Sequence, residues 1–370
     1  MASPRRPRWP RVSGVARGRT KSSRRGGSGA RRARQYRWER LGDDELLGLR
    51  LRDLRLQINR APTLQRCVQR LYGELVARGI RFRPHVWLAD EWFSPDGVPG
   101  IAIPFYLAHP RLLALERRIT HEAEGSNVNW LMRLLRHEAG HAIDNAYRLR
   151  RRARWRAVFG PASRPYRHWY RARPASRHHV QHLGDWYAQS HPAEDFAETF
   201  AIWLQPRSAW RSRYAGWPAQ RKLRFVQEIV TEIGGQRPPV RTRARIDALS
   251  DSERTLAEHY RRKLAWLRRR RRALADAILR RAFPARDPPG RLAAATLLRT
   301  HKQALVSSLM RATGFNRYSV YQIMRMAIER CERLDLRVQP PRRLALKRAR
   351  AALVHLVHAY GRSEALRVTA

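Results

Sequence analysis

The chain has 370 residues, 43% of them hydrophobic, which is enough to bury the cores of two or three domains and excludes a wholly disordered polymer. Its formal net charge of +47 permits contact with nucleic acid, anionic lipid or acidic protein. Two widely separated cysteines, Cys67 and Cys331, fit neither a disulfide framework nor a cysteine-based zinc site. No stretch approaches the roughly 18 apolar residues of a membrane span, and no signal peptide is visible, so we expect a cytoplasmic protein without membrane contact.

The N-terminal segment, residues 1–36, is rich in arginine, glycine, serine and proline and contains no acidic residue. Such a composition cannot bury enough apolar surface to order itself, so we expect a disordered basic arm. Leucines then recur at helical spacing in residues 43–56 and again in residues 63–77. This periodicity predicts two amphipathic helices after the arm.

Two short segments that follow are rich in aromatic and β-branched residues. They read RFRPHVWLA at residues 81–89 and GIAIPFYLA at residues 100–108. The connection between them contains Pro-Asp-Gly, a strong turn signal. We therefore predict a β-hairpin.

Three further helices are predicted before residue 240. The first has Ser126 as a candidate N-cap, and the second has Pro192 in its first turn and Pro206 at its end. The helices cover residues 130–147, 192–205 and 221–233. With the hairpin they form a predicted α+β domain that spans residues 37–240.

Residues 247–370 have an almost entirely helical and basic pattern, which predicts a separate C-terminal domain. Its first predicted helix, residues 250–283, contains five consecutive arginines at 268–272. Such a run is typical of a solvated helix face, although together with the N-terminal arm it could neutralise phosphates of a nucleic acid. Three more candidate helices reach about Tyr360.

Within this domain, the spacing of Gly314, Val320 and Ile323 is similar to that of a helix-turn-helix. Such a unit would begin its recognition helix with Asn316, Arg317 and Tyr318. Met310, however, stands where the motif prefers a small residue. An ordinary helical hairpin is therefore the favoured interpretation.

The sequence HEAGH carries the chemistry of the predicted site. Residues four apart share one helix face, so His137 and His141 can direct ring nitrogens at one ion about 2.0–2.1 Å away, the usual Zn–N distance. Glu138 falls beside that ion, where it could be the general base toward a zinc-activated water. A near copy, HEAEG, has Gly125 in place of the second histidine, so His121 has no chelating partner there. The alternative is an ordinary helix with a chance motif.

A catalytic zinc site needs three protein ligands and an open position. The predicted helix at residues 192–205 offers Glu194 and, one turn later, Glu198. The rest of this helix is largely apolar, so two carboxylates on it favour a buried role near a metal. A solvated acidic face is the alternative.

The motif HEAGHAID followed by PAEDFAETFA resembles the gluzincin metallopeptidases, in particular the Mlc titration factor peptidase and the catalytic domain of anthrax lethal factor. The resemblance covers residues 80–235 and implies a zincin-like α+β fold. Position by position, it implies zinc ligands at His137, His141 and Glu194. It also implies that Glu138 is the general base and that Glu198 orients a ligand histidine. The whole chain is similar to bacterial zinc-binding metallopeptidases of unassigned substrate.

The same resemblance points to Tyr187, seven residues before Glu194, as a hydroxyl that stabilises the oxyanion. A tyrosine that only packs in the core is the alternative. The strand at residues 100–108 precedes the HEAGH helix, where zincin folds place an edge strand that pairs with substrate. A buried core strand would have a similar sequence.

Other residues are alternatives to Glu194 as the third metal ligand. Metzincins require HExxHxxGxxH, but Asp144 and Tyr147 stand where that pattern needs glycine and histidine, so this class is excluded. A histidine could replace Glu194, as in proteases of the SprT type, and the candidates are His168, His178, His179 and His182. Asp144 is either an outer residue that supports a ligand or a helix-surface acid.

The sequence thus predicts a Zn²⁺-dependent peptidase that acts on a protein or peptide substrate. The alternative belongs to another class: a basic protein associated with nucleic acid, in which the metal site is structural or vestigial. The two functions can coexist in one chain.

Overall fold

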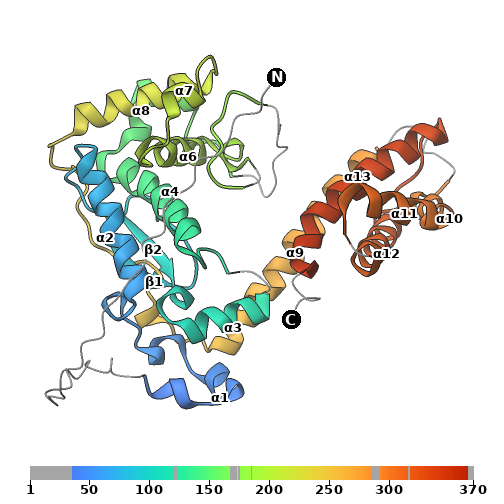
Figure 1. Ribbon diagram of the computed structural model, residues 1–370, viewed down its shortest axis with the longest axis horizontal. Coiled ribbons are helices and arrows are strands. Elements are labelled where there is room, and N and C mark those ends of the chain that lie inside the picture. The colour runs from blue at the N-terminus through green and yellow to red at the C-terminus, as the bar shows by residue number, and fades with distance from the viewer. Residues whose placement is uncertain are drawn as a thin grey trace, which may run out of the picture. The chain divides into compact units, whose positions relative to one another are not determined.

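The computed structural model describes residues 36–120, 123–166, 173, 176–184, 186–284, 292–315 and 317–365 (Figure 1). Of residues 270, 271, 318 and 361–365 it describes the backbone alone. Every helix and strand named below belongs to the second of two compact units, residues 37–370. The predicted basic arm lies outside the described residues except for Tyr36, and so do His121 and Glu122 of the HEAEG copy.

The first predicted helix is shorter than expected. Helix α1 covers Asp43–Gly48, and a separate 3-10 turn follows at Leu51–Leu54. The break occurs where the backbone pairs with a distant segment: the Leu256 N–H donates to the Leu49 carbonyl over 2.9 Å, and the Leu51 N–H donates to the Arg254 carbonyl over 2.8 Å. Helix α2, Pro62–Ala77, matches its predicted range.

The two predicted strands exist, but the hairpin prediction is wrong. Strands β1, His85–Ala89, and β2, Gly100–Pro104, form a parallel pair. The Pro-Asp-Gly turn does form, with the Val98 N–H donating to the Pro95 carbonyl over 3.0 Å, yet it lies inside a longer connection that carries the chain back before β2 begins.

The side chain of Asn145, near the end of helix α4 (Val128–Tyr147), holds this connection in place. Asn145 donates to the carbonyls of Pro95 and Val98 and accepts from the Gly97 N–H. The connection also pairs with β2, because the Ala102 N–H donates to the Phe93 carbonyl over 2.9 Å. These long-range contacts explain why a local turn signal gave the wrong strand direction. All five residues of β2 are buried, and the sheet that the described residues form has two strands, so pairing of β2 with an extended substrate stays a prediction.

Helices α3, Pro110–Thr120, and α4, Val128–Tyr147, lead into the predicted site. The side chain of Asn127 accepts a hydrogen bond from the Trp130 N–H over 2.9 Å, so Asn127 rather than Ser126 is the N-cap of α4. From Leu134 to Tyr147 every residue of α4 is buried. The HEAGH motif therefore lies on a core helix, and the alternative of a surface helix is excluded.

Helix α6, Pro192–Leu204, packs against α4, and all of its residues are buried. Aromatic rings of α5, Ala153–Phe159, contact it, with Trp155 and Phe159 both adjacent to Phe196. Helix α5 was not predicted. Helices α7, Trp210–Arg213, and α8, Ala219–Ile233, follow, and α8 packs on α6.

The described residues of the C-terminal part form five helices around a second hydrophobic core. These are α9 at Leu256–Ala282, α10 at Ala294–Thr300, α11 at Lys302–Thr313, α12 at Arg317–Arg333 and α13 at Arg342–Ala365. The core is built from residues between Ala275 and Val357. Four helices therefore follow α9, one more than predicted. The division of the chain into separate domains at residues 37–240 and 247–370 stays a prediction.

The candidate helix-turn-helix region consists of α11 and α12 joined through Gly314, whose φ of +72° ends α11 in the left-handed conformation. Val320 and Ile323 are buried in the second core. Asn316 and the side chain of Tyr318 lie outside the described residues. Among the helices that the structure describes, none combines the length and the apolar character needed to cross a bilayer.

Candidate metal centre

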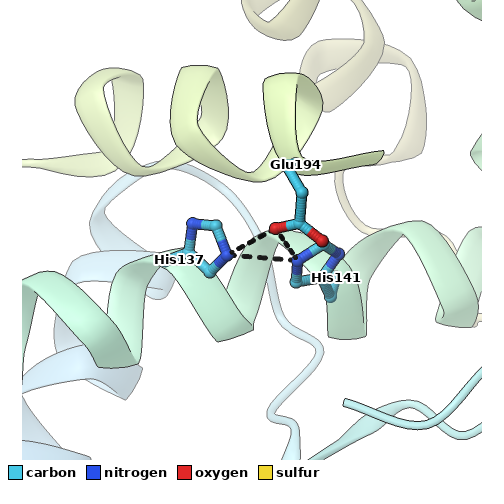
Figure 2. Close-up of side chains that lie close together, drawn as sticks. All are labelled: His137, His141 and Glu194. Atoms are coloured by element: carbon cyan, nitrogen blue, oxygen red, sulfur yellow. Dashed lines mark hydrogen bonds and ion pairs between the residues drawn. The ribbon is translucent and has the colours of Figure 1, made fainter. Parts of the chain in front are cut away.

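The two histidines of HEAGH lie on one face of α4, one turn apart (Figure 2). Both are buried, with 3% of His137 and 8% of His141 exposed. Their Nε2 atoms lie 3.2 Å apart. Two imidazoles held this close in the core need a proton or a cation between them to avoid facing lone pairs.

A close approach of two helices delivers the third group. A Cβ atom added to Gly140 would lie 2.8 Å from Cα of Ala197, so α4 and α6 touch where both side chains are minimal. One turn before Ala197, Glu194 points from α6 toward the histidines (Figure 2). The glycine of HEAGH and the alanine of the second motif thus set the distance across the site.

The three side chains converge on one point. Glu194 Oε2 lies 3.1 Å from Nε2 of His137 and 3.2 Å from Nε2 of His141. An ion about 2.0–2.1 Å from each of its ligands in a tetrahedron separates those ligands by about 3.3 Å. Among the described residues these three are the group that could hold a metal ion, so the donor types and their spacing both fit zinc.

Glu198 lies behind His137. Its Oε1 is 3.0 Å from Nδ1 of His137, and its Oε2 accepts a hydrogen bond from the Leu183 N–H over 2.8 Å. Glu198 is fully buried, so the alternative of a solvated acidic face is excluded for this residue. A carboxylate on Nδ1 fixes the ring orientation and directs Nε2 toward the ligand cluster.

The charges in the cluster are strongly coupled. Burial by itself would lower the pKa of His137, but its hydrogen bonds with Glu194 and Glu198 hold that pKa well above the usual value. Burial by itself would raise the pKa of Glu194, but the charge on His141 and the hydrogen bonds from both histidines hold it well below the usual value. The carboxylates therefore attract positive charge to this point.

Glu138, the residue after His137 on α4, is buried, with 7% of its surface exposed. Within the described residues, its Oε2 is a buried oxygen without a hydrogen-bond partner. The backbone carbonyl of Glu138 accepts from the Ser94 hydroxyl over 3.3 Å, which joins this turn of α4 to the connection between the strands. A buried carboxylate oxygen without a partner is costly unless water or substrate reaches it.

Asp144, one turn beyond His141, is fully buried, so a helix-surface acid does not describe it. It accepts from the Arg150 backbone N–H over 2.7 Å and from Arg150 Nε over 2.6 Å. Burial raises the pKa of Asp144, while the charge on Arg150 opposes that shift. Its contacts therefore tie the end of α4 to the following turn.

Two tyrosines lie next to the cluster. The ring of Tyr187, in a 3-10 turn at Tyr187–Gln189, has its centroid 5.7 Å from that of His137. The sequence reasoning missed Tyr166, whose hydroxyl donates to Glu194 Oε1 over 3.0 Å and whose ring stacks on His191 at 3.7 Å. Tyr166 lies 28 positions before Glu194 in an irregular polar stretch, where no periodicity links the two.

Apart from His168, which is outside the described residues, the histidines proposed as rival ligands do not belong to the group that could hold a metal ion. Nε2 of His182 contacts the Arg133 carbonyl over 2.9 Å, and burial lowers the pKa of His182 to about 4. Nε2 of His179 lies 3.8 Å from Oδ2 of Asp195. The described geometry thus favours Glu194 over these histidines.

Asp195 is a second buried acid that the sequence reasoning missed. Its Oδ2 forms an ion pair with Nζ of Lys222, on α8, over 2.6 Å. Burial raises the pKa of Asp195 to about 7, although the charge on Lys222 opposes the shift. This pair joins the first turn of α6, which carries Glu194, to α8.

Comparison with known families supports a metal site in this region. Residues 116–215 match the model of a family described as "Putative zinc-binding metallo-peptidase". That range contains the HEAGH motif and Glu194. No curated protein and no solved structure matches the chain. The finer resemblance to the Mlc titration factor peptidase and to lethal factor stays a prediction.

Proposed function

We propose that the protein is a zinc-dependent peptidase. The observation that carries the proposal is the convergence of two imidazole nitrogens and one carboxylate oxygen within 3.2 Å of one another, in a buried site. The match of residues 116–215 to a family of zinc-binding metallopeptidases gives independent support.

In this proposal His137, His141 and Glu194 hold the ion. Zn²⁺ bound there supplies Lewis acidity, which lowers the pKa of water and polarises the scissile carbonyl. Glu198 keeps His137 in the tautomer that presents Nε2 to the site. Helix packing at Gly140 holds Glu194 at ligand distance from both rings.

Glu138 is the proposed general base and acid. It accepts a proton from water as the water oxygen bonds to the scissile carbonyl carbon, and it then donates that proton to the amine nitrogen as the C–N bond breaks. Its Oε2 is buried and accepts no hydrogen bond from a described residue, which supports this role because its acceptor capacity is left unused by the protein.

A tyrosine hydroxyl is proposed to donate to the oxyanion that forms as water adds. Tyr187 is the candidate from the sequence, and its ring lies beside that of His137. Tyr166 is a second candidate, because its hydroxyl already lies 3.0 Å from the carboxylate of Glu194. Either side chain can supply the hydroxyl donor, and kcat of Tyr187→Phe and Tyr166→Phe distinguishes the two candidates.

The test is hydrolysis of unfolded casein and of a quenched peptide library by zinc-loaded wild type and Glu138→Gln. Loss of the base should reduce turnover by about 10²–10⁴-fold. Zinc content should stay at the wild-type level, since Glu138 is not one of the clustered donors. Glu228→Gln, at an exposed position on α8, is the matched control and should behave as wild type.

Two results would oppose the proposal. Full activity in Glu138→Gln would remove Glu138 from the chemistry. A wild type that binds zinc but cleaves no peptide in either substrate set would favour a structural metal site in a protein with another function.

A further inference from the structure

Helix α9 contains a stretch in which none of the described side chains is fully buried. Leu256 and Tyr260 are buried at its start, and Ala275, Ile278 and Leu279 are buried in the second core at its end. Between them, at residues 261–274, no residue whose side chain is described is buried. We call residues 261–274 the bridging stretch; it is one continuous segment of helix (Figure 1).

The bridging stretch is strongly basic. Residues 259–275 contain no acid and eight basic residues, Arg261, Arg262, Lys263 and Arg268 to Arg272. The two acids that flank them are already engaged: Glu258 caps the helix at Thr255, and Asp276 forms an ion pair with Arg330.

One cation of the stretch faces the protein, and five face away from it. Lys263 forms ion pairs with Glu91 and Glu116, each over 2.9 Å. The other five cations whose side chains are described are exposed, and none has an acidic partner within ion-pair distance among the described residues: Arg261, Arg262, Arg268, Arg269 and Arg272.

These five arginines form two rows. At about 100° per residue, Arg261, Arg268 and Arg272 fall within about 40° of one another around the helix axis. Arg262 and Arg269 fall about 90° away, and Lys263 points to the opposite side. From Arg261 to Arg272 the rows run for about 16 Å along the helix.

Like charges in such rows repel one another. Arg268 and Arg272 are four residues apart, a spacing at which equal charges destabilise a helix. The five exposed arginines have no acidic partner among the described residues, so no ion pair there offsets that repulsion. A bound polyanion would offset it, and the exposed guanidinium groups can bind phosphates in two-point contacts.

We propose that the bridging stretch of α9 binds duplex DNA. A helix of about 10–12 Å in diameter fits the major groove of B-form DNA, which is about 12 Å wide. Two rows of arginine about 90° apart can then reach phosphates on both walls of the groove. The contacts are to the backbone, so binding is independent of sequence and steeply dependent on salt.

An anionic membrane surface is the less favoured partner. A helix that lies in a membrane interface presents a continuous apolar face. The large apolar residues exposed in the bridging stretch are Trp266 and Leu274, which are eight positions apart with arginines between them. Double-stranded RNA also fits poorly, because the deep and narrow major groove of A-form RNA does not admit a helix.

The test measures binding of full-length protein to a fluorescent DNA duplex as a function of salt concentration. In one variant glutamine replaces the five arginines of the two rows, which keeps the helix propensity of these positions. The control variant carries five Arg→Gln changes at exposed positions outside the C-terminal helices: Arg207, Arg221, Arg224, Arg237 and Arg243. The two variants have the same net charge, and circular dichroism checks that both keep the wild-type helix content.

Each phosphate contact contributes about 0.9 to the slope of log affinity against log salt concentration. We expect the α9 variant to lower the magnitude of that slope by up to about 4.5 and the control variant to leave it near the wild-type value. A duplex RNA of equal length should bind more weakly than DNA. Because the assay measures binding, its outcome is independent of whether the metal centre is catalytic.

The proposal is overturned if wild type does not bind DNA at low salt, or if the two variants change the slope equally. It is also overturned if duplex RNA binds as tightly as DNA, which would indicate attraction to any polyanion. If the α9 variant loses the binding of wild type to vesicles of phosphatidylcholine and phosphatidylserine but binds DNA as wild type does, the stretch would be assigned to membranes instead.

Discussion

The metal centre and the bridging stretch of α9 both concentrate charge on helices, but they differ in whether the charged side chains are buried and paired. In the metal centre the side chains of His137, Glu194 and Glu198 are almost entirely buried, and each contacts a partner of opposite charge. In the bridging stretch the five arginines whose side chains are described are exposed and have no acidic partner among the described residues. Charge that is buried and paired acts over short distances at a fixed point, whereas exposed charge of one sign acts over about 10 Å and is screened by salt.

The comparison predicts two kinds of sensitivity. Function at the metal centre should respond to changes of single atoms and hardly at all to ionic strength, because buried pairs are screened weakly. Function of the bridging stretch should respond to the number of charges and to salt, while a single substitution there should have a small effect.

The largest single-atom effect beyond Glu138 is expected from the tyrosines. Removal of one oxyanion donor typically reduces turnover by about 10²–10³-fold. If Tyr187 is the donor, Tyr187→Phe should show this loss and Tyr166→Phe should show a much smaller one. The measurement is kcat for both variants at equal zinc content. Equal, small losses in both would remove a tyrosine from the reaction.

The next effect concerns Glu198, which contacts His137 rather than the ion. Loss of such a supporting carboxylate usually weakens metal binding by about 10–100-fold. We expect Glu198→Gln to show this change in a competitive chelator titration, and Glu228→Gln to show none. The loss should persist at high salt, because Glu198 is fully buried. An unchanged zinc affinity would show that the contact with Nδ1 of His137 does not support the site.

A smaller effect is expected where α4 and α6 touch. Gly140→Ala places a Cβ 2.8 Å from Cα of Ala197, and overpacking of this kind costs about 1–3 kcal/mol of folding free energy. Gly73→Ala, in α2, has no atom within 4 Å of the new Cβ and should stabilise the protein slightly. Urea denaturation measures both. A neutral Gly140→Ala would mean that the two helices can move apart freely.

The smallest effect concerns pH. His259, near the start of α9, is buried, and its Nε2 has no hydrogen-bond partner among the described residues. Burial lowers the pKa of His259 to about 4, below its unfolded value of 6.5. The unfolded chain therefore binds the proton first, and stability falls as pH drops from about 6.5 toward 4.

Between pH 7.5 and 5.5 this histidine should cost about 1 kcal/mol of the free energy of unfolding. His259→Gln should remove that part of the pH dependence, and His355→Gln, at an exposed position of α13, should leave it unchanged. Identical pH profiles for wild type and His259→Gln would contradict the assignment.

Much of the candidate site could be predicted because its information is local. HEAGH places two histidines on one helix face by spacing alone, and two acids on an apolar helix indicate buried carboxylates. The structure brings His137, His141 and Glu194 together, and it buries Glu138, the residue that follows His137 on α4. Their chemical roles stay predictions until activity is measured.

The features that were missed depend on contacts between distant segments. Asn145 donates hydrogen bonds to the connection between the parallel strands β1 and β2. A local turn rule cannot include this long-range contact. Tyr166 reaches Glu194 from an irregular stretch without periodicity. The break after α1 results from pairing between Leu51 and Arg254, which are some 200 positions apart.

The most direct test of the central claim is metal content. Wild type and Glu194→Ala are dialysed against metal-free buffer, reloaded with zinc, dialysed again and analysed by mass spectrometry, with Glu228→Ala as the control. The account predicts about one zinc ion per chain in wild type and in the control, and much less in Glu194→Ala. A wild type that retains no zinc, or a Glu194→Ala variant that retains as much as wild type, would contradict it.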